Sequence, residues 1–205
     1  MTTRPSHAER SGRTRRALLD AGRVSFADVG YARTTTGELA RRAGVTRGAL
    51  YYHFHNKTTL FKAVFEEVHQ ECLQAMRTCM ETAAGDTWER FLASLRVLVA
   101  QLGHPSVQRI VAVDGPAVLD WPGARHGPLG PQSLRPVFEQ LVTEGVLKPL
   151  PLDPLCRLVW TACFEAALHI AQPETRGGGQ QDMTVTLMGL IGGLRRKQEA
   201  EGRQD

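Results

Sequence analysis

The chain has 205 residues, of which 42% are hydrophobic and 22% charged, so it is long enough for one or two globular domains with a buried core. No run of apolar residues approaches the roughly 20 that are needed to cross a bilayer. The first 16 residues are polar and basic and lack the apolar segment of a secretory signal. We therefore expect a cytoplasmic protein that has no membrane span.

Positive charge is concentrated at the start of the chain. Up to Lys57 there are 11 Lys or Arg and 4 Asp or Glu, which give a net charge of +7. The remainder of the chain has 14 Lys or Arg and 17 Asp or Glu, which give a net charge of −3. A basic segment joined to a slightly acidic body favours binding of a polyanion by the first quarter of the chain. A solvated arginine-rich surface explains the same charge, so a functional assignment needs a motif.

The thiols and imidazoles give no clear metal or redox motif. The four cysteines form two pairs with a spacing of seven: Cys72 and Cys79, Cys156 and Cys163. Seven helical residues rise about 10.5 Å, too far for a disulfide within either pair. We expect buried reduced thiols, although pairing between helices and a redox switch stay open. His69 and Cys72 can begin a metal site with His104 or Cys79, but no recognised ligand set is present, and we expect no cofactor.

Apolar residues recur at intervals of three and four along nearly the whole chain, without the strict alternation of a half-buried strand. This pattern predicts an all-α fold of about nine helices. The expected spans are residues 12–29, 36–43, 47–53, 56–83, 86–103, 105 onward, 133–143, 153–171 and 181–196. Between Asp114 and Gln132 the chain holds four Gly and four Pro, which predict a broken connection with one turn of helix around residues 117–121.

Residues 34–57 have the features of two short helices joined by a tight turn. Thr35 and Glu38 have the spacing of a capping box, which satisfies unpaired N–H groups at a helix start. Gly44 can take the left-handed conformation that ends this helix, and Thr46 can cap the next one. Two short helices joined by about three residues match a helix-turn-helix, whose second helix enters the major groove of DNA.

The second short helix is expected to have different inner and outer faces. Leu50 and Phe54, four residues apart, form the inner face. Arg47 can pair bidentately with a guanine edge, and Gly48 allows DNA to approach the backbone closely. Hydroxyl and imidazole donors for phosphates follow on the same helix: Tyr51, Tyr52 and His53. Part of a tyrosine ring can instead pack against the first helix.

The segment LARRAGVTRGALYYHFHNK, residues 39–57, together with Gly30, Tyr31 and residues 34–36, resembles the N-terminal signature of the TetR family of bacterial regulators. The resemblance covers residues 12–65, and the rest of the chain matches only in length and helix count. It implies an all-helical homodimer with a divergent ligand-binding body and repression that a small molecule relieves. By position it implies these DNA contacts: Thr36, Thr46, Arg47, Gly48, Tyr51, Tyr52, His53 and Lys57.

Four positions depart from the family pattern. Arg23 and Ser25 stand where an apolar residue is usual, and Thr58 and Thr59 stand where acidic residues are usual. These departures concern the packing of the first helix and the cap of the fourth, not the fold.

We expect an N-terminal three-helix helix-turn-helix domain at residues 1–57, with a flexible basic segment at 1–11. A larger helical ligand-binding and dimerisation domain follows at 58–205. Gly189, Gly192 and Gly193 lie within five residues of the last predicted helix, although each costs about 1 kcal/mol relative to Ala. Such glycines indicate close packing, which fits a homodimer through the C-terminal helices. A contact within one chain would explain them equally.

Large apolar side chains of the body are candidates for lining a ligand pocket, although core packing explains each of them as well. They are Met76, Phe91, Leu95, Trp121, Phe138, Trp160 and Phe164. The segment DGPAVLDW at residues 114–121 resembles a segment that lies near the ligand cavity in some members of the family.

The sequence therefore predicts a sequence-specific DNA-binding regulator, a repressor released from a palindromic operator by an unidentified small-molecule effector. The alternative is a DNA-binding regulator or activator that has no such ligand. Its expected partners are double-stranded DNA, the effector and a second copy of the chain. The sequence has no paired catalytic carboxylates, phosphate-cradling glycine loop, HExxH or nucleophile elbow, so we do not expect an enzyme.

Overall fold

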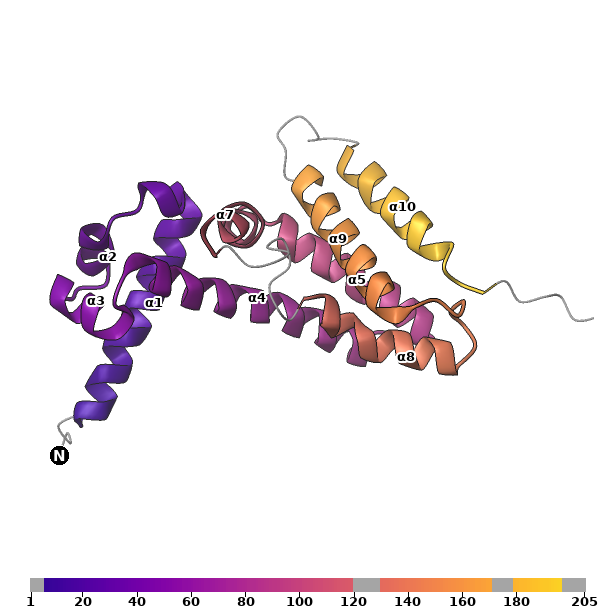
Figure 1. The fold of residues 1–205 in the computed structure, drawn as a ribbon, viewed down its shortest axis with the longest axis horizontal. Coiled ribbons are helices and arrows are strands. Elements are labelled where there is room, and N and C mark those ends of the chain that lie inside the picture. The colour runs from indigo at the N-terminus through magenta and orange to yellow at the C-terminus, as the bar shows by residue number, and fades with distance from the viewer. Residues whose placement is uncertain (1–5, 120–129, 171–178, 197–205) are drawn as a thin grey trace, which may run out of the picture. The chain divides into compact units, whose positions relative to one another are not determined.

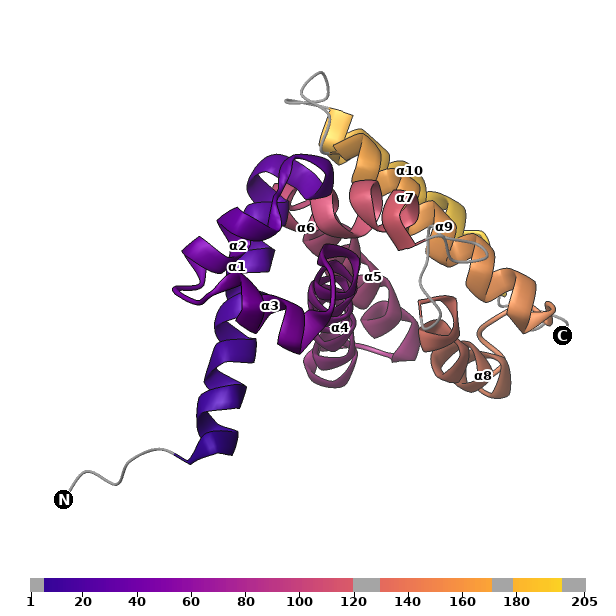
Figure 2. The ribbon, with the colours of Figure 1, turned by 60° about the vertical axis from the view of Figure 1, so that its left-hand side comes forward.

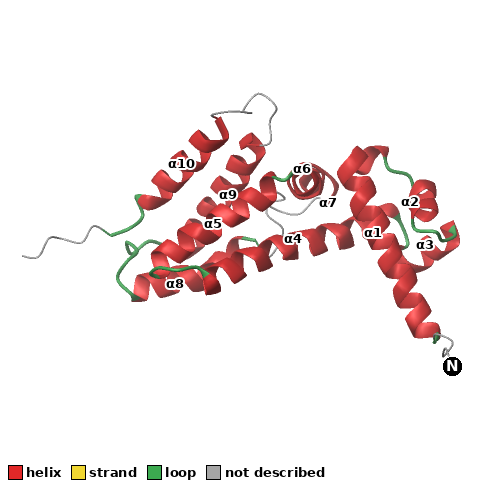
Figure 3. Cartoon of the chain, turned by 180° about the vertical axis from the view of Figure 1, so that it is seen from behind, coloured by secondary structure: helices red, strands yellow, loops and turns green. Residues whose placement is uncertain are grey.

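The computed structural model describes residues 6–119, 130–170 and 179–196. Within these ranges the regular structure is helical, apart from one isolated bridge between Leu147 and Arg195 (Figures 1 and 3), which confirms the all-α prediction. The elements in chain order are α1 (His7–Arg33), α2 (Thr36–Arg42), α3 (Arg47–Phe54), α4 (Lys57–Thr82), α5 (Thr87–Gly103), α6 (Pro105–Gln108), the π-helix η1 (Arg109–Asp114), α7 (Gly115–Leu119), the 3-10 helix η2 (Pro131–Leu134), α8 (Arg135–Thr143), α9 (Leu152–Ile170) and α10 (Gly179–Gly192).

The chain divides into two compact units. The first comprises Met1–Glu71 and His104–Arg125, and the second comprises Cys72–Gly103 and His126–Asp205, so that α4 belongs to both. The domain boundary at residue 57 stays a prediction. Among the described helices, none combines the length and the apolar character that a membrane span requires.

Helix α1 begins earlier than its apolar pattern predicts. Ser6 and Glu9 form a capping box, which satisfies the first N–H groups and starts the helix at His7, inside the segment expected to be flexible. Gly30, the predicted stop, has a φ of +82° and interrupts the helical backbone. One more turn follows to Arg33, and Thr34 then lies buried with its hydroxyl donating to the carbonyl of Gly30 at 2.8 Å.

The core of the first unit lies between α1, α2, α3 and the N-terminal half of α4 (Figure 2). Leu18, Phe26, Leu39, Leu50 and Phe61 are fully buried there. The rings of Phe26 and Phe61 meet edge to face with centroids 5.1 Å apart, an arrangement that aromatic pairs prefer.

The predicted connection does not begin at Asp114, because α6, η1 and α7 follow one another from Pro105 to Leu119, and α7 overlaps the single helical turn expected around residues 117–121. A wider π-helical turn ends at Asp114, immediately before the Gly115–Pro116 pair. Proline lacks an N–H and its ring clashes with the preceding turn of an α-helix, and a π turn relaxes that geometry. Gly115 also packs against Phe65, whose ring would be 2.5 Å from an added Cβ. Residues 120–129, the rest of the predicted connection, lie outside the described residues.

The core of the second unit is built around α9, which packs against α5 and α10. Phe91 of α5 meets Phe138 of α8 with ring centroids 5.2 Å apart, and Trp160 meets Phe164 within α9 at 5.5 Å.

All four cysteines are free thiols, and burial raises the pKa of Cys163 to about 12. A thiol held protonated in this way is a poor nucleophile.

Candidate functional site

The turn between α2 and α3 is built as the sequence predicts. The Thr35 hydroxyl accepts from the N–H of Glu38 at 3.2 Å, and the Glu38 carboxylate accepts from the N–H of Thr35 at 3.0 Å. The hydrogen bonds from Thr35 lower the pKa of Glu38, which stabilises the capping box with the carboxylate ionised. Gly44 has a φ of +66°, and the Thr46 side chain accepts from the N–H of Ala49.

Helix α3 has the predicted division into two faces. Leu50 and Phe54 are buried against the rest of the first unit. Tyr51 is 46% exposed and Tyr52 is 73% exposed, so both rings present surface to solvent. An exposed aromatic face on a short capped helix fits contact with another molecule.

The structure brings several predicted DNA-contact residues together. The hydroxyl of Thr36, in the first turn of α2, lies 3.4 Å from the Tyr51 hydroxyl and 3.4 Å from an Arg47 Nη atom. The rings of Tyr52 and His53 meet at 5.2 Å. Arg47, Thr46 and Gly48 are exposed at the start of α3. Donors from both short helices therefore lie on one surface, as contact with phosphates and base edges requires.

Lys57, predicted as a phosphate contact, also has a structural role. Its half-buried Nζ donates to the carbonyls of Tyr31 at 2.8 Å and Thr34 at 2.9 Å. It also lies 4.1 Å from the centroid of the Tyr31 ring. An ammonium group has three donors, so these two bonds leave one donor for a phosphate.

Polar groups from η1 hold the interrupted end of α1, an arrangement that sequence analysis missed. Asp114 accepts from the N–H of Tyr31 at 2.7 Å, and Arg109 donates to the carbonyl of Val29 at 3.3 Å. The Arg109 guanidinium packs so closely on Gly30 that an added Cβ would lie 2.6 Å from it. The signal in the sequence was Gly30 alone, since its partners lie about 80 residues away.

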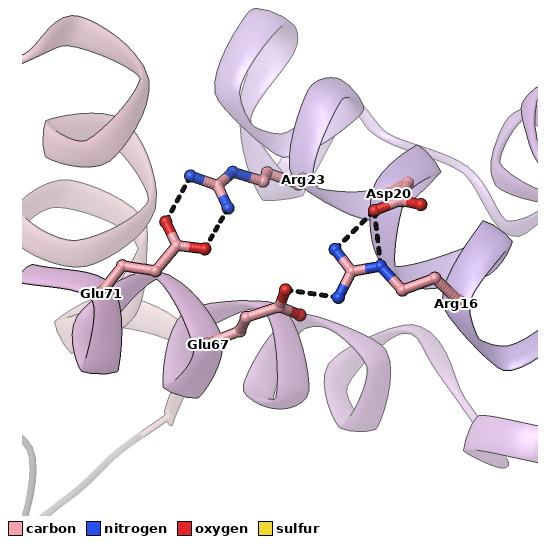
Figure 4. Close-up of polar contacts among 5 residues, drawn as sticks. All are labelled: Arg16, Asp20, Arg23, Glu67 and Glu71. Carbon is pink, nitrogen blue, oxygen red and sulfur yellow. Dashed lines mark hydrogen bonds and ion pairs between the residues drawn. The ribbon is translucent and has the colours of Figure 1, made fainter. Parts of the chain in front are cut away.

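Two ion pairs join α1 to α4 within the first unit (Figure 4). Arg23 pairs bidentately with Glu71, with nitrogen–oxygen distances of 2.5 and 2.6 Å. Arg16 lies between Asp20 and Glu67 and pairs with both. The partners raise the pKa of both arginines. The ion pair with Glu71 explains why position 23 holds a cation here. At the start of α4, the Asn56 side chain accepts from the N–H of Thr59, which replaces an acidic cap.

The second unit contains a groove of about 240 Å³ between α4, α5, η2 and α8, somewhat smaller than the roughly 300 Å³ at which typical ligand sites begin. Its apolar lining includes Leu134 and Val137, and its polar lining includes Arg77 and Gln140. The remaining lining residues are Met76, Met80, Phe91, Ser94, Ser133 and Pro136. This composition suits a small and mainly apolar molecule.

Of the predicted pocket residues, Met76 and Phe91 line this groove. Four others lie buried in the core of the second unit: Leu95, Phe138, Trp160 and Phe164. Trp121 lies outside the described residues. Sequence analysis missed most of the lining, although the four-residue spacing of Met76 and Met80, and of Ser133 and Val137, places each pair on one helical face.

Comparisons with known proteins agree with this architecture. The family model described as bacterial regulatory proteins of the tetR family matches residues 18–64, and a Tetracyclin repressor-like C-terminal domain model matches residues 88–194. The chain is 42% identical over 62 residues to the HTH-type transcriptional regulator TtgR of Pseudomonas putida, a match that covers 30% of each protein. The chain thus spans less than a third of the length of that curated relative.

Solved structures of other proteins have a similar fold, and two of them serve as examples. A TetR-family transcriptional regulator from Pectobacterium atrosepticum superposes with a TM-score of 0.74 and 29% identity, covering 94% of this chain and 99% of that one. The regulator RolR, in complex with the ligand resorcinol, superposes with a TM-score of 0.65 and 20% identity, covering 90% of each chain. The latter likeness concerns the fold alone.

A helical body attached to a helix-turn-helix with an exposed basic and aromatic face defines a DNA-binding transcription regulator. With family models matched at both ends, this chain belongs to the TetR family of transcriptional regulators.

Proposed function

We propose that this chain is a homodimeric repressor that binds a palindromic operator and leaves it when a small molecule occupies the second unit. The observation that carries the proposal is the exposed face of α3, where Arg47, Tyr51 and Tyr52 stand beside Thr36 of α2. Arg47 contacts a guanine edge, and the neighbouring hydroxyls contact phosphates. The other proposed contacts are Thr46, Gly48, His53 and Lys57.

The proposed dimer interface lies on α9 and α10. Leu158 on α9 is 69% exposed, and Val185 and Leu190 on α10 are 63% and 71% exposed. Large apolar side chains exposed together on packed neighbouring helices are typical of a surface that a partner covers. Gly189 and Gly192 have no atom within 4 Å of an added Cβ, so they leave room for a second backbone to approach. Two-fold symmetry then places two copies of α3 on a palindromic site.

The proposed effector site is the groove of the second unit. Its apolar walls take the body of a small molecule, and Arg77, Gln140 and Ser133 supply hydrogen bonds to its polar groups. The complex of the fold relative RolR with resorcinol supports a compound of this size and type. Binding releases DNA only if the ligand prefers the conformation of the protein that has low operator affinity.

The experiment selects a duplex from a random library with the wild-type chain and then adds resorcinol and other small aromatic and aliphatic compounds. We expect at least one compound to release the duplex. Val137→Trp fills the groove and should abolish release while operator binding persists. The control Val142→Trp alters an exposed position of the same helix and should respond like wild type. Selection of a duplex that no compound releases would favour the ligand-free regulator.

A further inference from the structure

We propose that the first turns of α1, residues His7–Arg16, form a second DNA-binding element that contacts phosphates beside the bases read by α3. Arg10 and Arg13 are the contacting residues. The inference rests on the proposed operator binding by α3. The family model begins at residue 18, and the DNA contacts that the resemblance implies begin at Thr36.

The segment is an ordered helix that holds its arginines in fixed positions. The Ser6 hydroxyl accepts from the N–H of Glu9 at 3.2 Å, and the Glu9 carboxylate accepts from the N–H of Ser6 at 2.6 Å. This capping box fixes the helix start and uses the only acidic side chain between residues 6 and 16. A preordered element loses less conformational entropy on binding than a flexible tail.

The four arginines of the segment have different surroundings. Arg16 is neutralised by Asp20 and Glu67, and the Arg15 guanidinium lies over the ring of Phe54. Arg10 and Arg13 are exposed, and no carboxylate of the described residues lies within ion-pair distance of either. They are three residues apart, so they lie on one face of the helix. These two cations therefore remain available for an anionic partner.

The position of the segment favours duplex DNA as that partner. Arg15 lies 5.2 Å from the ring centroid of Phe54, which ties α1 to the last residue of α3. Beyond this contact the N-terminal turns of α1 project past α3 (Figures 1 and 2). From Arg15 to His7 the helix spans about 12 Å, enough to follow about four base pairs of duplex at 3.4 Å each.

The test measures how operator affinity depends on salt and on the length of the flanking duplex. The probe is the duplex that the wild-type chain selects, with flanks of full length or trimmed to the bases protected by α3. In R10Q/R13Q we expect the slope of log affinity against log salt to become shallower by about two for each bound chain. Trimming the flanks should lower the operator affinity of wild type and leave the affinity of R10Q/R13Q unchanged.

Two further variants separate charge from folding. R10K/R13K keeps both charges and should retain the steep slope. Arg96→Gln removes an exposed charge from α5 and should leave both the slope and the response to trimming as in wild type. If wild type binds a duplex but R10Q/R13Q has the same slope and the same response to trimming, the second element does not exist. If wild type selects no duplex, the proposed function fails and this inference fails with it.

Discussion

Lys57 joins the start of α4 to the end of α1. Its two hydrogen bonds to the carbonyls of Tyr31 and Thr34 cross from one helix end to the other. The family signature marked this lysine as a DNA contact, because a motif identifies a position without showing what else the side chain contacts. A loss of DNA binding on its replacement therefore has two sources, which a stability measurement separates.

We predict that Lys57→Met lowers the free energy of unfolding by about 1–3 kcal/mol, since it leaves two partly buried carbonyls without their charged donor. The measurement is urea-induced unfolding of the variant beside Lys62→Met. Among the described residues, Lys62 forms an ion pair only with Glu66, an exposed one at 3.8 Å, and such pairs contribute about 0.2–1 kcal/mol. Equal unfolding midpoints for Lys57→Met and wild type would exclude the structural role.

His69 gives the protein a specific pH dependence. It is 4% exposed, and burial lowers its pKa from 6.5 to about 4. The unfolded chain therefore binds a proton between pH 6.5 and 4 that the folded chain does not. We predict that its contribution to stability is fully present above pH 6.5 and is lost as the pH falls toward 4, by up to about 3 kcal/mol.

Denaturant unfolding at pH 7 and pH 4.5 measures this effect when wild type is compared with His69→Phe. Carboxylates titrate in both proteins, so the difference between the two pH dependences isolates the imidazole. If the two proteins lose the same stability on acidification, His69 is not held neutral by burial.

At the scale of elements, the interrupted end of α1 leads directly into the helix-turn-helix. Gly30 has a positive φ, and Arg109, Asp114 and Lys57 hold the backbone on either side of it. An L side chain at this position would be strained by its φ and would also clash with Arg109.

We predict that Gly30→Ala lowers the free energy of unfolding by more than about 1 kcal/mol, because both the φ and the space are unsuitable. Gly12 of the same helix is the matched control, since an added Cβ there meets nothing within 4 Å. Gly12→Ala should raise stability by about 0.5–1 kcal/mol. Opposite shifts in the thermal midpoint are expected, and a neutral Gly30→Ala would contradict this account.

The helix-turn-helix was predictable because local interactions determine it. The Thr35–Glu38 capping box, the Gly44 turn and the Thr46 cap each lie within a few residues, and each is confirmed. The continuous helical path through Asp114 and Gly115 was not predictable, since Gly115 packs against the distant Phe65. For the same reason the groove lining was mostly missed, because burial of Phe138 and Trp160 depends on how helices pack.

At the scale of the whole molecule, the proposed binding to a palindrome requires two chains. We predict that Leu190→Glu converts a dimer into a monomer, because a carboxylate on the proposed interface would lose its hydration without a partner. Sedimentation velocity measures the change against a chain mass of 22.6 kDa. Val113→Glu, which alters an exposed apolar residue of η1, should remain dimeric. A wild-type monomer at micromolar concentration would exclude the two-fold operator model.

The most direct test of the central claim is a fluorescence anisotropy titration of the selected duplex with wild type and Arg47→Ala. Wild type should bind this duplex at least about a thousand times more tightly than a random duplex, with two chains per palindrome. Arg47→Ala should lose about 1–3 kcal/mol of discrimination at one base pair of each half-site. Equal wild-type affinity for both duplexes would contradict the account, as would unchanged base discrimination in Arg47→Ala.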